Sequence, residues 1–232
     1  MEMIWEGFAE ACRIVFSGDA LVLRACWRTL WISSLAVAAA TVLGLPLGSW
    51  LARTAFRGRS VIVLAVRAGM AMPTVFVGGV AYALFSRRGP FGPLDLLYTP
   101  WAIIIGELLL AVPIVAAISQ GAIKALDPRV SETAMTLGAG RFQRWTTYIS
   151  EARIGICLAV LTAFARCLTE LGIAMMVGGN IKGRTRTLAT ATALETSKGE
   201  FSRGIAMGVI LLLIALSVTV LIAWFGRENK DA

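Results

Sequence analysis

The sequence predicts an all-α integral membrane protein, with five transmembrane helices preceded by an N-terminal interfacial helix. Of its 232 residues, 57% are hydrophobic and 16% are charged, whereas a soluble globular domain carries about 25% charged residues. The mean hydropathy is +0.76. Because one bilayer crossing needs roughly 20 apolar helical residues, the chain has room for about five or six crossings. No sizeable soluble domain fits beside them.

The first segment, residues 1–28, is amphipathic and mixed in charge. Its aromatic residues Trp5, Phe8, Phe16 and Trp27 suit the boundary between the lipid tails and headgroups. We therefore expect an interfacial segment over residues 1–28. Its first ten residues lack a basic stretch, so they do not resemble a cleavable signal peptide.

Two charge-free runs, Thr29–Ala52 and Gly204–Gly226, are long enough to span a bilayer. Three further apolar runs are interrupted by charge, and they predict the second, third and fourth spans: Val61–Phe85, Trp101–Ala122 and Ile154–Val177. A transmembrane domain is thus expected over 29–225, followed by a tail over 226–232. Small-residue spacings such as Gly44-xxx-Gly48 and Gly204-xxx-Gly208 permit close helix contacts.

A short helix is expected to begin at Pro128, after the third span. Asp127 is a good N-cap, Pro128 suits the first helical position, and Gly138 is a typical stop. Val130, Ala134 and Leu137 fall at helical spacing, which suits docking into a groove of a partner. On these residues alone, the pattern favours an ordinary amphipathic connector.

Glu132-Thr133-Ala134, three residues and then Gly138 resemble the EAA loop of the membrane subunits of ABC importers. Further segments are similar to the oxyanion-importer permeases, above all those for tungstate. These segments are 43–48, 72–78, 163–172, 170–187 and 193–201. The resemblance extends over nearly the whole chain, from about Met1 to Phe225.

This resemblance implies a type I ABC importer permease with a cytoplasmic coupling helix in an EAA-type loop at about 124–153. Two copies of a separate ABC ATPase would dock there, through Glu132, Thr133, Ala134, Gly138, Ala139 and Arg141. It also implies a homodimer in the inner (plasma) membrane and an extracytoplasmic oxyanion-binding protein. The N-terminus would lie outside and the C-terminus in the cytoplasm.

The sequence lacks the motifs that would indicate catalysis by this chain. There is no histidine, no CxxC and no GxxxxGK[ST], so we expect neither a zinc site nor a P-loop. We expect the chain to be no enzyme and to bind no cofactor, with ATP and Mg on the partner ATPase. Its basic residues lie mostly between apolar runs, which favours membrane lipid over nucleic acid as their partner.

Four charged residues lie within the expected spans, where an isolated charge costs about 2.5–3.5 kcal/mol on translocon scales. Arg166 and Glu170 are four residues apart and can pair on one helix face. Arg67 and Glu107 are in neighbouring spans and are expected to form a second pair. Such pairs either hold the bundle together or exchange partners during transport.

A basic segment follows the fourth span and contains no acidic residue. Its cationic and neutral donors suit a tetrahedral oxyanion; they are Asn180, Lys182, Arg184, Thr185 and Arg186. The expected topology places it at the outer mouth of the pathway. The same segment also suits contact with lipid phosphate or with an acidic patch on the binding protein.

Two alternatives to tungstate import stay open from the sequence. One is a permease for molybdate or another oxyanion such as sulfate. The other, of a different class, is a passive anion channel or secondary transporter, although the spans show no inverted repeat, which many secondary transporters have.

Overall fold

The computed structural model describes residues 5–6, 9–10, 12–13 and 19–227. Within these ranges the chain is helical and has no strand. The helices from Ala20 onward, in chain order, are α2 (Ala20–Arg53), α3 (Arg59–Gly69), α4 (Thr74–Phe85), η1 (Gly92–Leu94), α5 (Pro100–Lys124), α6 (Pro128–Thr136), α7 (Arg141–Glu151), α8 (Arg153–Leu168), α9 (Gly172–Gly178), α10 (Leu188–Ser197) and α11 (Phe201–Arg227).

The first long helix, α2, begins before the charge-free run that predicted it. The Asp19 side chain accepts a hydrogen bond from the Leu21 backbone N–H at 2.8 Å, which caps the helix at this point. Residues 20–28 therefore continue without a break into the first expected span. Most of the expected interfacial segment before Asp19, and the tail after Arg227, lie outside the described residues.

The second expected span is broken in the middle. Helices α3 and α4 meet at an angle of 97° instead of forming one helix over Val61–Phe85. Pro73 precedes α4; it lacks an N–H and disfavours helical geometry in Met72, so the helix cannot continue through this point.

The fourth expected span, Ile154–Val177, is also interrupted. Helix α8 ends at Leu168 and α9 begins at Gly172. Between them the Glu170 side chain accepts a hydrogen bond from the Ile173 N–H at 3.0 Å, and this bond starts a new helix. A second bend, of 72°, separates α7 from α8.

Three helices in the described part of the chain are long and apolar enough to cross a membrane: α2, α5 and α11. The number rises to five if the bent pairs α3–α4 and α7–α8 each count as one span. The expected five crossings therefore match the upper number, and the fourth crossing then includes α7.

The most extensive helix contact joins α2 to α5. Gly44 and Gly48 make the close approach possible, because a Cβ on Gly48 would lie 2.5 Å from the Ala116 carbonyl oxygen. At Gly204 the nearest atoms belong to Thr196 of α10. Both small-residue spacings thus serve packing within this chain.

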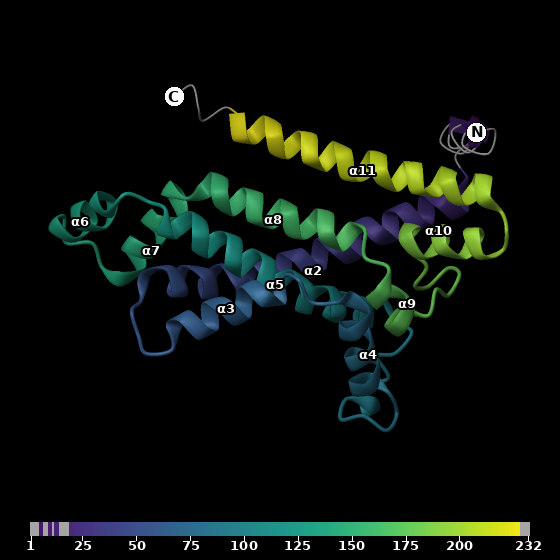
Figure 1. Ribbon diagram of the computed structural model, residues 1–232, viewed down its shortest axis with the longest axis horizontal. Coiled ribbons are helices and arrows are strands. Elements are labelled where there is room, and N and C mark those ends of the chain that lie inside the picture. Colours follow the sequence, from purple (N-terminus) through teal and green to yellow (C-terminus); the bar gives the residue numbers. More distant parts are fainter. Residues whose placement is uncertain (1–4, 7–8, 11, 14–18, 228–232) are drawn as a thin grey trace.

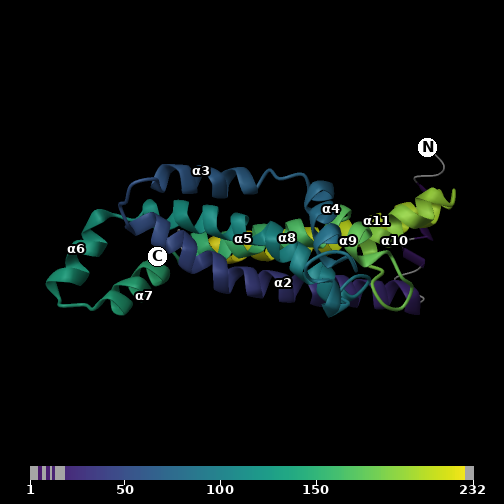
Figure 2. The same ribbon diagram turned by 90° about the horizontal axis from the view of Figure 1, so that it is seen from below.

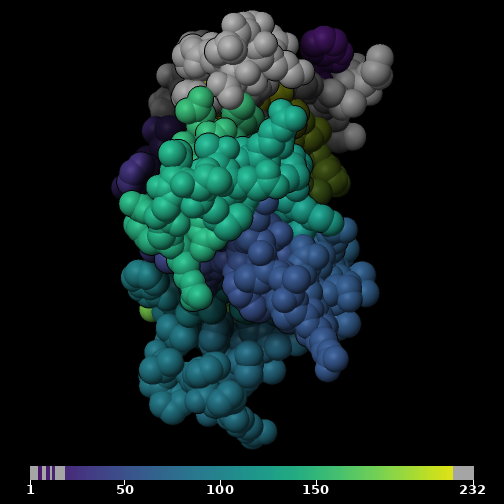
Figure 3. All heavy atoms as spheres, turned by 90° about the vertical axis from the view of Figure 1, so that its left-hand side faces the viewer, coloured from purple at the N-terminus to yellow at the C-terminus, as the bar shows by residue number. Residues whose placement is uncertain are grey.

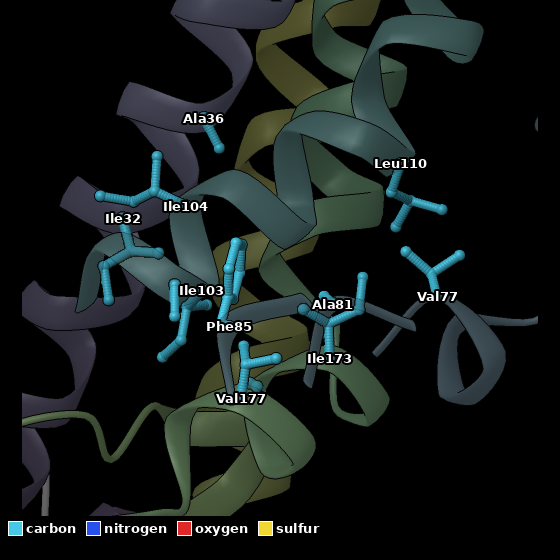
Figure 4. Close-up of a cluster of buried hydrophobic side chains, with 12 residues drawn as sticks. Ile32, Ala36, Val77, Ala81, Phe85, Ile103, Ile104, Leu110, Ile173 and Val177 are labelled. Carbon is cyan, nitrogen blue, oxygen red and sulfur yellow. The ribbon is translucent and has the colours of Figure 1, made fainter. Parts of the chain in front are cut away.

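A buried apolar cluster packs the short helices α4 and α9 against the long helices α2 and α5. Figure 4 shows Ile32 of α2, Ile103 of α5, Phe85 of α4 and Val177 of α9 gathered around one centre. The short helices α4 and α9 are therefore held in the bundle by side-chain packing.

The molecule is elongated, and its two ends differ. At one end α6 and α7 project beyond the long helices, with the C-terminal end of α11 on the same side (Figure 1). At the other end lie α9, α10 and the N-terminal end of α2. Helix α3 runs along one edge of the bundle, beside α5 (Figure 2).

Candidate functional site

The segment from α6 to α7 has the local structure that its sequence predicts. The Asp127 side chain accepts a hydrogen bond from the Arg129 N–H at 2.8 Å, and Pro128 is the first helical residue. The helix ends in a Schellman motif, in which the Ala139 N–H donates to the Ala134 carbonyl at 2.9 Å. Gly138 has a φ of +73°, which favours glycine.

The exposed face of α6 differs from the one expected. Val130 packs against a core cluster and Ala134 is buried, so these two residues do not form an outer face with Leu137. Leu137, with 81% of its surface exposed, and Met135 are instead the free apolar side chains. Glu132, Thr133, Thr136, Gly138 and Arg141 are exposed as well, and Ala139 is half-buried.

The α6–α7 segment projects beyond the long helices at its end of the molecule. Figure 3 looks onto that end, with α6 and α7 in teal beside the blue α3. Phe142, at the start of α7, is 72% exposed and adds a third large apolar side chain to Met135 and Leu137. Monomeric soluble proteins seldom expose such groups together, and they are typical of a docking surface.

One of the two expected intramembrane ion pairs is present. Arg166 Nη1 lies 2.8 Å from Glu170 Oε2, with the glutamate side chain buried and that of the arginine partly exposed. The other oxygen of Glu170 accepts the Ile173 N–H. Glu170 thus joins the end of α8 to the start of α9.

The expected pair between Arg67 and Glu107 does not form. Arg67 donates instead to Gln120 at 3.5 Å. Glu107 lies more than three helical turns from Gln120 on α5, roughly 20 Å along the axis. Glu107 is buried, and neither its Oε2 nor the Ser33 Oγ has a hydrogen-bond partner. The sequence places these residues in neighbouring spans, but it does not show how far along the bundle each one lies.

In the basic segment after α9, three of the expected anion contacts are used by the segment itself. The Thr185 hydroxyl is fully buried, donating to the Gly178 carbonyl at 2.6 Å and accepting from the Ile181 N–H at 2.9 Å. Arg186 donates to the side chain and carbonyl of Asn180. Lys182 and Arg184 are the two of the five that stay exposed.

Arg28 of α2 is hydrogen-bonded to the backbone of the basic segment. Arg28 donates to the carbonyls of Arg186 and Gly183, at 2.9 Å and 3.0 Å. Neither this role of Arg28 nor Gln120 as the partner of Arg67 was predicted from the sequence. The one sequence signal for Arg28 is its position directly before the charge-free run Thr29–Ala52.

We predict that Thr185→Val destabilises the protein by about 1–3 kcal/mol, because it leaves a buried carbonyl and a partly buried N–H unpaired. Thr162→Val is the matched control, since the Thr162 hydroxyl is exposed and donates only to the preceding turn of α8. Thermal unfolding of the two variants in detergent measures the difference. Equal stability of the two variants would show that the buried hydroxyl does not stabilise the loop.

The described part of the chain contains no group of three or more residues suited to hold a metal ion. Its charged and polar features include the α6–α7 segment, the buried carboxylates and the basic loop.

Comparison with known sequences gives one family model and several similar permeases. The family model "Binding-protein-dependent transport system inner membrane component" matches residues 44–230. The tungstate uptake system permease protein TupB of Peptoclostridium acidaminophilum is 36% identical, over 96% of this chain and 97% of that protein. TupB of Campylobacter jejuni is 38% identical over 93% of this chain and 90% of its own length. The molybdenum transport permease ModB of Escherichia coli K12 is 26% identical over 88% of this chain.

Solved structures share the fold. An inward-facing structure of the MetNI methionine ABC transporter has a TM-score of 0.72 at 19% identity and covers 90% of this chain and 95% of its own. A bacterial alginate importer has a TM-score of 0.73 at 17% identity, covering 89% of this chain and 79% of its own.

The relatives are permease subunits of ABC transporters, which are not enzymes themselves and depend on an ATPase in a separate subunit. The family match covers most of the sequence, and the relatives align over nearly their full lengths. The chain therefore belongs to the inner membrane components of binding-protein-dependent transport systems.

Proposed function

We propose that this chain forms the membrane pathway of an ATP-driven importer for tungstate. We choose tungstate because the two TupB permeases are 36% and 38% identical over nearly the whole chain. Molybdate and sulfate permeases match at 26–30% identity. They therefore define the alternative substrates.

The α6–α7 segment is the surface on which the ATPase docks. Its exposed Met135, Leu137 and Phe142 form an apolar surface that a partner can cover, and Glu132, Thr133 and Arg141 supply polar contacts around it. Two ATPase copies would engage a homodimer of this chain, and they would carry ATP and Mg. Nucleotide-driven movement of the segment would then bias the helices between inward and outward states.

The proposed topology has five crossings, with the N-terminus outside and the C-terminus in the cytoplasm. Its support is the arrangement in Figure 1, where the C-terminal end of α11 lies on the same side as α6 and α7. The start of α2 and the basic loop lie at the opposite end. That end would face the extracytoplasmic binding protein.

The experiment is reconstitution of the purified chain in vesicles with the P-loop ATPase that copurifies with it. We expect a 1:1 ratio of the two subunits and tungstate uptake only with ATP and the loaded binding protein. Competition with molybdate and sulfate identifies the anion. Uptake by this chain alone, without ATP, would instead identify a channel or secondary transporter.

The exposed cations of the basic loop give a second prediction. We expect Lys182→Glu with Arg184→Glu to lower uptake at least about fivefold, because opposite charges at an interface slow association. The exchange Lys182→Arg with Arg184→Lys keeps the charge and is expected to retain uptake. The measurement is uptake rate against binding-protein concentration. Equal rates for both double variants would exclude a role of this loop in docking.

A further inference from the structure

A cavity of about 960 Å³ lies where α6 and α7 meet the C-terminal end of α2. Its polar and charged lining contains three arginines and no carboxylate. The lining residues are Pro46, Ser49, Trp50, Ala52, Arg53, Thr54, Ser131, Met135, Arg141, Arg144, Trp145 and Tyr148. The cavity is therefore strongly positive, and the function proposed above uses neither Arg53 nor Arg144.

Two of the arginines have donors that lack acceptors. The Nε and Nη2 atoms of Arg53, and Nε of Arg144, are buried without a hydrogen-bond partner. Nε and Nη2 form the edge of a guanidinium that binds two oxygens of one anion side by side. None of the ion pairs among the described residues includes Arg53, Arg141 or Arg144.

Several other polar groups of the cavity are paired, and they define its walls. Trp145 Nε1 donates to Ser49 Oγ at 2.8 Å, which joins α7 to α2. The Tyr148 hydroxyl is hydrogen-bonded to Ser131 Oγ of α6, also at 2.8 Å. The Arg53 guanidinium lies 4.3 Å from the centre of the Tyr148 ring. The cavity thus has defined walls while its cationic donors are free.

One face of α7 builds much of this wall. Arg141, Arg144, Trp145 and Tyr148 follow the spacing i, i+3, i+4, i+7, which places them on one side of a helix. The sequence therefore contains the signal for this cavity. It becomes a site only when α7 packs beside Arg53.

We propose that this cavity binds a tetrahedral oxyanion, either free in solution or as the phosphate of a lipid headgroup. Buried guanidinium donors without acceptors are costly, and an oxyanion supplies paired acceptors and the opposite charge. The bound anion joins the end of α2 to α6 and α7. Occupancy stabilises one position of the α6–α7 segment, and its effect on coupling rests on the ATPase docking proposed above.

The test is binding of sodium tungstate and of inorganic phosphate to the full-length permease, purified in delipidated detergent, by titration calorimetry. We expect saturable binding that weakens at least about tenfold in Arg53→Gln with Arg144→Gln. The matched control is Arg57→Gln with Arg129→Gln, which removes the same charge from exposed positions at this end of the chain and is expected to bind like the wild type. Size-exclusion profiles check that each variant is folded.

A second variant, Arg53→Lys with Arg144→Lys, keeps the charge but loses the paired donors, and we expect intermediate binding. Added phosphatidylglycerol distinguishes the sources: competition with tungstate identifies a lipid phosphate, and its absence a free anion. No binding by the wild type, an equal loss in the control, or unchanged binding in Arg53→Gln with Arg144→Gln would overturn the proposal. Because no ATP or transport is involved, these results are independent of the proposed import function.

Discussion

Gly138→Trp is expected to abolish ATP-driven uptake while the protein stays folded in the membrane. Gly138 has a φ of +73°, a region that costs a residue with a Cβ about 1–2 kcal/mol. Its turn completes the Schellman motif that ends α6. A tryptophan there adds bulk to the proposed docking surface of the ATPase, beside the exposed Leu137.

Space within this chain is not the constraint at Gly138, because a Cβ would meet no atom within 4 Å. The expected loss of uptake therefore has two causes: a clash with the docked ATPase and strain in the backbone at a positive φ. Gly138→Asn separates the two, since asparagine tolerates a positive φ and is small; we expect it to retain most uptake. The measurements are uptake in vesicles and copurification of the ATPase.

The matched control is Gly199→Trp. Gly199 has a φ of +84° and equally open surroundings, but it lies between α10 and α11, away from the docking segment. We expect this variant to keep its ATPase. Normal uptake by Gly138→Trp, or loss of the ATPase in both tryptophan variants, would contradict docking at the α6–α7 segment.

The parts of the fold that sequence reasoning predicted are those governed by local chemistry. The N-cap at Asp127, the helix start at Pro128 and the stop at Gly138 all agree with the structure. So does the pair of Arg166 with Glu170, because residues four apart on one helix meet without help from tertiary structure.

The parts that differ are not visible in the hydropathy pattern, because a single residue breaks a span or because the contact involves another segment. Pro73 and Glu170 break two expected spans. A hydropathy average over the whole span does not reveal either break. The level of Arg67 relative to Glu107 depends on how α3 lies along α5, which no local pattern specifies. Thr185 was expected to face an anion, but it is buried and hydrogen-bonded within its own loop.

Glu170→Ala is expected to lower the free energy of unfolding by about 1–3 kcal/mol, because it leaves the buried Ile173 N–H without an acceptor. It also removes the ion-pair partner of Arg166, whose side chain is 38% exposed, so the loss is at least that of the hydrogen bond to Ile173. The control is Glu200→Ala, since Glu200 is exposed. Thermal unfolding in detergent measures both.

Glu170→Gln distinguishes a structural carboxylate from one that takes part in transport. The amide oxygen of glutamine can still accept the Ile173 N–H, so the start of α9 is kept while the charge is lost. If Glu170 acts by holding α8 to α9, this variant keeps stability close to the wild type and transports normally. Loss of uptake at unchanged stability would instead mean that the charge itself is needed, because the hydrogen bond at α9 survives in that variant.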